Sequence, residues 1–175
     1  MKTHTVIALA VAGMISPLMA EPAPVQAKID IAFVNVDSKW FADLETTAKP
    51  LLQRKNGKVA VPSVTATNGQ TAAMEVIREY RTRSSPAKGP VVPCGIMINL
   101  TPELHGQGIR LFGTCVLRRM TNKSVNDVVT RFAAQEALVD LQFQDGESKS
   151  FEMEDGGKIL LTATLIDATG TPIKK

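Results

Sequence analysis

Few of the side chains that carry out catalysis are present in this sequence. Its 175 residues include two histidines, two cysteines, one tryptophan and one tyrosine. His105 is the only histidine beyond residue 20, and with two cysteines it makes neither a metal constellation nor a Ser–His–Asp set. No Gly-rich phosphate loop is present, and the Gly156–Gly157 pair is typical of a turn between strands. We therefore expect no enzyme activity, no cofactor, no metal site and no small-molecule substrate.

A strong excess of either charge is also absent. The chain has 20 Lys and Arg against 17 Asp and Glu, and its formal net charge is +3. This balance is too mild to indicate nucleic-acid binding, and the basic stretches 78–88 and 117–123 are typical of solvated strand ends. We therefore expect no nucleic-acid partner.

Long hydrophobic runs are absent beyond the first 20 residues. The N-terminus has one lysine, a short apolar run, a Ser-Pro pair and small residues, which is typical of a secretory signal peptide cleaved between Ala20 and Glu21. A retained membrane anchor is the alternative, although the run is short for a membrane span. We expect a signal peptide at 1–20, a flexible leader at 21–27 and a single domain at 28–175. The protein would be exported to the periplasm, the outer-membrane periphery or the medium.

Alternating apolar residues are abundant and predict strands. The predicted strands are 28–36, 58–67, 70–80, 91–100, 109–117, 136–143, 148–153 and 156–167. Apolar residues at helical spacing between 38 and 51 predict one short helix, ended or kinked by Pro50, with Asn56-Gly57 as its stop signal. Residues 124–135 fit a short helix or a loop equally well. The pattern predicts a mainly-β antiparallel sandwich of about seven or eight strands with one short N-terminal helix.

The Asn68-Gly69 pair lies between two of the predicted strands. A type I′ turn needs positive φ at both central residues, which Asn-Gly tolerates best, so the sequence predicts a hairpin. The hairpin would place Thr67 opposite Gln70 and Val61 opposite Val76. Pro62 cannot donate a ladder hydrogen bond, which predicts an edge or a bulge at that position.

Two further hairpins follow from matching apolar faces. The strands 91–100 and 109–117 align when Leu100 opposes Ile109, and this register also places Cys94 opposite Cys115. Because an exported chain meets an oxidising compartment, we expect a Cys94–Cys115 disulfide, with two buried free thiols as the alternative. A turn at Asp145-Gly146 is expected to pair the strands beside it and, with a longer loop or a bulge, to set Phe151 opposite Leu141.

Four segments, in the same order, resemble the secretin homology domain of the outer-membrane channels of type II and type III secretion and type IV pili. The segment VPSVTATNGQTAAMEV matches the family's Pro-X-Val-X-X-X-Asn-Gly-Gln-X-Ala pattern at Pro62, Val64, Asn68, Gly69, Gln70 and Ala72. GIMINLTPEL looks like the family's Gly-containing strand, with Gly95, Thr101 and Pro102 at the matching positions. FQDGESKSFEM, with Asp145 and Gly146, and ILLTATLIDATGTPI are similar to the domain's last two strands.

The resemblance implies a secretin-related, immunoglobulin-like sandwich and a place in the cell envelope. The sequence departs from the family in three ways: the ring-building domains are missing, the long gate segment is reduced to a short loop, and the apolar segment after Asp145-Gly146 is polar. These departures favour a non-enzymatic accessory component of a type IV pilus or secretin-type secretion system that contacts other envelope proteins. An oligomeric secretin-type outer-membrane channel, formed as a homo-oligomer, and a secreted module that binds host surfaces or glycans are the alternatives.

Overall fold

The computed structural model describes residues 25–42, 44, 48–81, 90–122 and 131–173. The elements are β1 (Gln26–Val34), η1 (Ser38–Trp40), η2 (Lys49–Leu51), β2 (Gln53–Lys55), β3 (Lys58–Thr67), β4 (Ala72–Arg81), β5 (Val91–His105), β6 (Gly108–Asn122), β7 (Arg131–Gln144), β8 (Glu147–Glu152) and β9 (Lys158–Ile166). The predicted signal peptide and residues 124–130 lie outside the described residues. Residues 131–135, expected to be helix or loop with the rest of 124–135, are part of β7 instead, so that prediction is wrong there. Gln26 and Ala27, predicted for the leader, belong to β1 instead, and Ala27 is fully buried.

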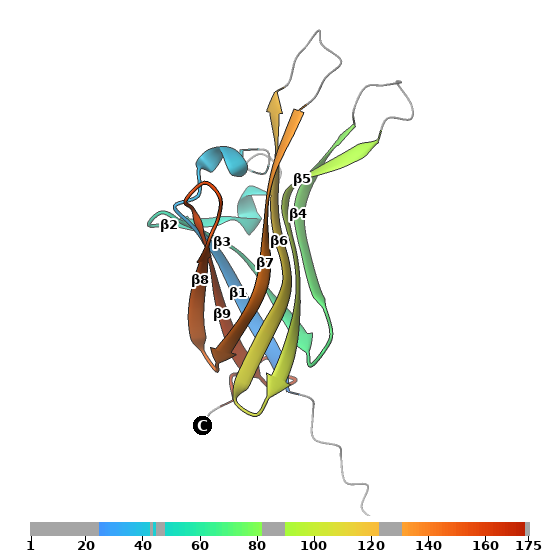
Figure 1. Ribbon diagram of the computed structural model, residues 1–175. Coiled ribbons are helices and arrows are strands. Elements are labelled where there is room, and N and C mark those ends of the chain that lie inside the picture. Colours follow the sequence, from blue (N-terminus) through green and yellow to red (C-terminus); the bar gives the residue numbers. More distant parts are fainter. Residues whose placement is uncertain (1–24, 43, 45–47, 82–89, 123–130, 174–175) are drawn as a thin grey trace, which may run out of the picture.

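Two antiparallel sheets pack face to face (Figure 1). The first sheet has five strands in the order β2-β3-β1-β9-β8, and the second has four in the order β4-β5-β6-β7. The chain changes sheet between β3 and β4 and again between β7 and β8. The mainly-β sandwich is therefore confirmed, and the structure has one strand more than predicted because β2 was not expected.

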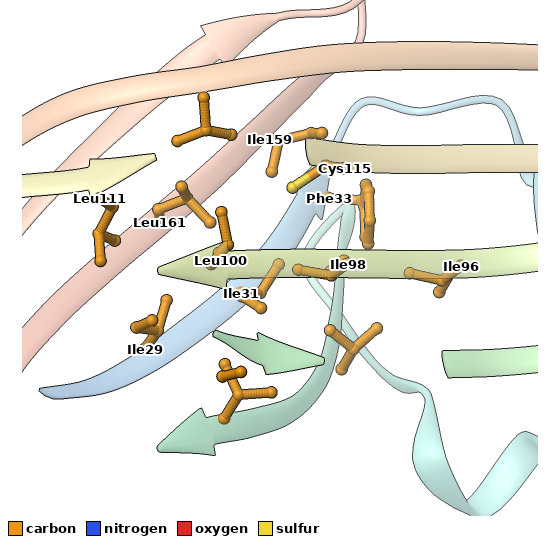
Figure 2. Close-up of a cluster of buried hydrophobic side chains, with 14 of the residues drawn as sticks. Ile29, Ile31, Phe33, Ile96, Ile98, Leu100, Leu111, Cys115, Ile159 and Leu161 are labelled. Atoms are coloured by element: carbon orange, nitrogen blue, oxygen red, sulfur yellow. The ribbon is translucent and has the colours of Figure 1, made fainter. Parts of the chain in front are cut away.

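The inner faces of the two sheets form one apolar core (Figure 2). The strands alternate as predicted, because every second residue of β1 and β9 is buried. Facing them, β5 and β6 contribute a second row of buried side chains. The largest fully buried side chains of these four strands are Phe33, Ile29, Ile96, Ile98, Leu100, Ile109, Leu111, Leu117 and Ile159.

The helix predicted after β1 is not formed by the described residues of that segment. They make two single 3-10 turns, and Asp37 caps the first by accepting a 2.9 Å hydrogen bond from the Lys39 backbone N–H. Pro50 lies inside the second turn, where its missing donor prevents a longer helix. Phe41 and Leu44 are fully buried, so the apolar spacing reflects a segment that covers the core at one end of the sandwich.

The prediction of a hairpin at Asn68-Gly69 is also wrong. β3 pairs with β1, whereas β4 pairs with β5, so the turn crosses from one sheet to the other. Asn68 is not among the positive-φ residues, so the turn is not type I′; Gly69 has φ +72°. The type I′ pattern occurs instead at Asn56 and Gly57, which were expected to end a helix and which join β2 to β3.

The Pro62 prediction is confirmed as a bulge. Ile29 pairs with Val64 and Ile31 with Val61, so Pro62 and Ser63 together oppose one residue of β1. β2 pairs with β3 only up to Ala60, so beyond that residue the far side of β3 is an open edge. Pro62 therefore lies where its nitrogen does not have to donate a hydrogen bond to a neighbouring strand.

β5 and β6 form the predicted hairpin in a different register. Ile98 pairs with Cys115 and Leu104 with Ile109, which is a shift of four residues that keeps the apolar faces together. Cys94 is four residues from the partner of Cys115, about 13 Å along the strand at roughly 3.3 Å per residue. The expected disulfide is therefore wrong: no disulfide joins the two cysteines, and both are buried. The register prediction failed because matching faces fix a register only to within an even number of residues.

The pairing of β7 with β8 is wrong for the same reason as the first hairpin. β7 pairs with β6, and β8 pairs with β9, where Phe151 opposes Ile159 and not Leu141. Gly156 and Gly157 lie in the turn that joins β8 to β9, as predicted. Both short turns that were expected to close hairpins are thus arches that join the two sheets.

Candidate interaction surface

The described residues hold no group of three or more His, Cys, Asp or Glu side chains that could bind a metal. His105 is exposed at the β5–β6 turn. Trp40 is buried beneath the guanidinium of Arg119 and donates a 2.9 Å hydrogen bond to Asp155, so it offers no stacking surface to a sugar. No helix in the described part of the chain is long and apolar enough to cross a membrane.

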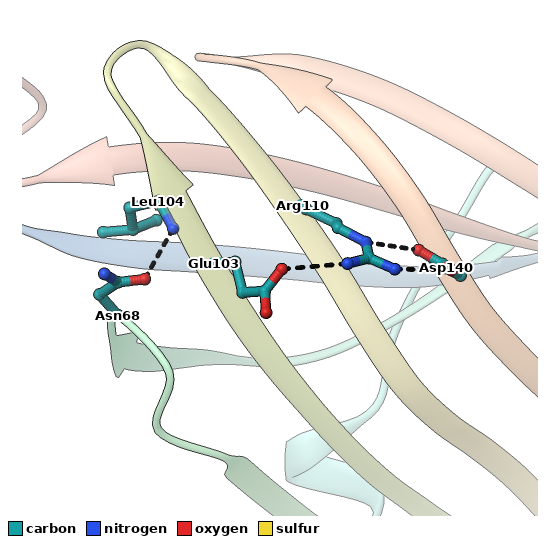
Figure 3. Close-up of polar contacts among 5 residues, drawn as sticks. All are labelled: Asn68, Glu103, Leu104, Arg110 and Asp140. Atoms are coloured by element: carbon teal, nitrogen blue, oxygen red, sulfur yellow. Dashed lines mark hydrogen bonds and ion pairs between the residues drawn. The ribbon is translucent and has the colours of Figure 1, made fainter.

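Most residues of the secretin-like motifs gather at the end of the sandwich where the chain changes sheet. Asn68 accepts a 2.8 Å hydrogen bond from the Leu104 backbone N–H through its side chain (Figure 3). The Gly69 N–H donates to the Pro102 carbonyl at 2.7 Å, and the Thr71 and Thr101 hydroxyls are 2.7 Å apart. The first arch is thereby fastened to β5, which gives Asn68, Gly69, Thr101 and Pro102 a structural role. Gln70 is exposed and its N–H closes the turn on the Thr67 carbonyl.

The second arch is fastened in the same way. Asp145 accepts a 2.8 Å hydrogen bond from the Leu165 N–H, and the Gly146 N–H donates to the Ala163 carbonyl at 2.8 Å. The Leu165 N–H and the Ala163 carbonyl both belong to β9, in the five-stranded sheet. Asp145 and Gly146 therefore hold the two sheets together. Val64, the motif residue on β3, belongs to the apolar core.

Gly95 marks a close approach between β5, β4 and the segment before β2. Its φ is +137°, and a Cβ atom built there would lie 2.2 Å from the Val76 carbonyl oxygen and 2.9 Å from a Leu44 methyl carbon. Only glycine fits this position without a backbone shift. The motif glycine thus keeps the strand pair and the buried Leu44 in contact.

The outer face of the four-stranded sheet carries one charged cluster. Arg110 on β6 donates to both carboxylate oxygens of Asp140 on β7, at 2.9 and 3.0 Å, and to Glu103 on β5 at 3.1 Å (Figure 3). The bidentate bonds from Arg110 hold the pKa of Asp140 below its usual value, and the two carboxylates raise the pKa of the guanidinium. The single guanidinium bonds to both carboxylates, so the cluster ties three neighbouring strands together and keeps a formal net charge of −1.

Farther along the same face the surface is apolar in the middle and acidic at both margins. Met97 of β5 pairs with Val116 of β6, and both are half-buried. The row ends in Glu75 on β4 and Glu136 on β7, both exposed. In the next row, Leu138 of β7 is 81% exposed, which is more than any other exposed large hydrophobic side chain among the described residues. Sequence alternation marked this face as mixed, but it gave no sign of which strands form its margins.

The margin formed by β7 pairs with β6 on one side only. Near the arch its other side is covered by β8 side chains: Glu147 accepts a 2.7 Å hydrogen bond from the Gln144 N–H, and Lys149 donates to the Gln142 carbonyl. These contacts show that even-numbered residues of β7 turn their backbone groups toward the open side, since successive residues of a strand point opposite ways. The two contacts therefore identify which residues of β7 present their backbone N–H and C=O groups at the free edge of the sheet.

Solved structures with a similar fold are secretins. GspD, a type II secretin from enteropathogenic Escherichia coli, matches with a TM-score of 0.51 and 11% identity over 87% of this chain and 72% of that one. GspD of the ETEC pilotin–secretin AspS–GspD complex matches with a TM-score of 0.51 and 10% identity over 85% of this chain and 50% of that one. The V. cholerae type IV competence pilus secretin PilQ matches with a TM-score of 0.48 and 12% identity over 85% of this chain and 62% of that one.

No family model matches the sequence, and no curated protein matches it. The likeness to the two GspD structures confirms the resemblance drawn from the four motifs, at the level of the fold.

Proposed function

We propose that this chain is a non-enzymatic, exported protein of the cell envelope that serves as an accessory component of a secretin-type secretion or type IV pilus system. The observation that carries the proposal is the secretin fold, which extends over 87% of the chain in the GspD match. In this fold the domain would act through contacts with other proteins of the envelope.

The open strand edges support this mode of action. β7 is 14 residues long and β4 is 10, and each pairs with one neighbour only. Unpaired edges of this length are templates for strand addition by another chain. The exposed Leu138 beside one of them adds apolar area that a partner would cover.

An oligomeric outer-membrane channel is the second candidate, and strand length favours it. β5 and β6 have 15 residues each, whereas about 9–11 residues suffice for a membrane-spanning strand. Charged residues on the outer face weigh against it; they are Glu75, Glu136 and Arg110. A basic residue that faces lipid near the bilayer midplane costs about 2–4 kcal/mol, and an acidic residue costs less.

The test combines genetics with particle size. Deletion of the gene in its host should impair secretion or pilus assembly, and the purified protein without residues 1–20 should run as a small species in detergent-free gel filtration with light scattering. A heat-resistant ring recovered from outer membranes would establish the channel instead. Normal secretion and pili together with a defect confined to glycan or surface binding would favour a secreted binding module.

A further inference from the structure

The edge of β7 divides into a covered half and an open half. Lys149 and Glu147 occupy the backbone groups of Gln142 and Gln144, as described above. By the same alternation the outward N–H and C=O groups belong to Glu136, Leu138 and Asp140 farther along the strand. No described residue hydrogen-bonds to those outward groups. One half of the strand is thus protected against pairing, and the other presents an unprotected ladder about five residues long.

A cavity lies beside this open half. It measures about 240 Å³ and is lined on the β7 side by Gln135 and Ala137 and on the β8 side by Phe151 and Met153. Phe151 packs against the core without being fully covered. On the opposite face of the strand the exposed Leu138 adjoins the same stretch of backbone. A strand laid along β7 would therefore meet apolar surface with the side chains of both its faces.

An unsatisfied polar group marks the wall of the cavity. Gln135 is 7% exposed, and its side-chain oxygen is a buried acceptor without a hydrogen-bond partner. On the neighbouring strand, two pairs farther along and outside the cavity lining, the Nε of Arg119 is a second buried donor without a partner. Buried unpaired polar atoms are uncommon and cost free energy, and amide groups of an added chain offer both a donor and an acceptor.

The rim of this site is acidic. Glu136 on β7 and Glu152 and Glu154 at the end of β8 surround the cavity. Lys158 pairs with Glu152 at 3.3 Å, but no described cation pairs with Glu136 or Glu154. The charge left over is negative, and the complementary partner is a segment rich in lysine or arginine.

We propose that residues 136–140 of β7 bind an extended, basic segment of another protein, which adds to the sheet as a fifth strand. A lysine or arginine of that segment lies opposite Glu136, and an apolar residue lies opposite Leu138. The side chain between them enters the cavity against Phe151 and Met153. This inference rests on the proposed function only in requiring a protein partner, and it specifies where that partner binds and with what chemistry.

A second copy of this chain fits the edge less well. In the row of the sheet that ends at Glu136, the opposite margin is Glu75 of β4. If β4 of one copy paired with β7 of another so that these rows were aligned, the two carboxylates would lie opposite each other. Like charges directly opposed across strands are destabilising. The charges thus select a basic partner segment over self-association in that register.

The binding test uses the purified full domain and a labelled peptide, KTVVVKVTK, with two matched peptides. In the first, glutamate replaces each lysine; in the second, proline replaces the valine expected opposite Leu138 in the antiparallel register. The basic peptide should bind at least about tenfold more tightly than either, because the proline removes a ladder donor and the glutamates face Glu136 and Glu154. Hydrogen exchange should slow at the amides of Glu136 and Leu138.

Charge reversal on the protein completes the design. Glu136→Lys should weaken the basic peptide about five- to tenfold and strengthen the acidic one, whereas Glu75→Lys, in the same row at the other margin, should change neither. Both substitutions are on exposed residues, so folding is preserved. Equal binding of the proline peptide, an equal effect of Glu75→Lys, or protection at other amides would overturn the proposal.

Two further outcomes distinguish this inference from the proposed function. If sedimentation shows self-association that Glu136→Lys alters, and no peptide binds, the occupant is a second copy and the inference is wrong. If no peptide binds but the deletion strain loses secretion or pili, the inference fails and the envelope function stands. Peptide binding with normal secretion and pili would leave the site intact and remove the envelope function.

Discussion

Replacing Gly95 by alanine tests whether the contact between β5, β4 and Leu44 determines the stability of the domain. The added Cβ would lie 2.2 Å from the Val76 carbonyl oxygen and 3.0 Å from the Ile77 Cα, both backbone atoms that move only with their strand. The positive φ of +137° adds strain of about 1–3 kcal/mol, and overpacking adds about 1–3 kcal/mol. We expect Gly95→Ala to lower the free energy of unfolding by about 2–6 kcal/mol.

Gly106→Ala is the matched control. Gly106 also has a positive φ, +61°, but a Cβ there would meet no atom within 4 Å. Its cost should be limited to the backbone term, about 1–2 kcal/mol. Urea denaturation followed by Trp40 fluorescence measures both variants, since Trp40 is the only tryptophan and is buried. Equal losses in the two variants would refute the argument from the close contact, and a changed m-value would mean that the two-state analysis fails.

Three other predictions concern the arches, the charged cluster and the cysteines. Asp145→Ala should destabilise the domain by about 1 kcal/mol in the same urea assay, because the Leu165 N–H loses its acceptor; no loss would mean that the arch does not depend on this bond. The Asp140 carboxyl should titrate below its usual pKa by NMR and return toward it in Arg110→Met, and since the folded pKa is lowered, the associated stability is present above the unfolded pKa and disappears as the pH falls through the folded one. Cys94 and Cys115 should resist alkylation in the native protein and react after unfolding, because both are buried and burial raises the pKa of the Cys115 thiol to about 12; a Cys94–Cys115 cross-linked peptide in non-reducing mass spectrometry would contradict the observed register.

Much of the strand content followed from the sequence because burial on one face imposes a period of two. The alternation at Ile29, Ile31 and Phe33 and again at Ile159 and Leu161 predicted both strands and their buried faces. The bulge at Pro62 was also predictable, since proline cannot join a ladder. These features depend on local geometry, which a single sequence records.

The partners of the strands could not be predicted in the same way. Asn68-Gly69 and Asp145-Gly146 are short turns between alternating strands, and that pattern is satisfied equally by a hairpin within a sheet and by an arch between two sheets. The choice depends on β1 and β9, which pair with each other and occupy the positions beside β3 and β8. The residues of the turn are the same whichever strands pair, so they do not reveal this competition between distant strands. The register of β5 with β6 failed similarly, because a shift of four residues preserves every buried face.

The arches also explain why the candidate site was hidden from the sequence. A hairpin with Phe151 opposite Leu141 would have placed the β8 backbone along the half of β7 nearest the turn and occupied the outward N–H and C=O groups there. Because the chain turns into the other sheet at Asp145-Gly146, β8 contributes only the side chains of Glu147 and Lys149 to that edge, and the ladder beyond them stays open. The turn that fastens the two sheets is thus the same feature that exposes residues 136–140 to a partner. Lengthening this turn would loosen the sandwich and the edge together, whereas charge reversal at Glu136 separates binding from folding.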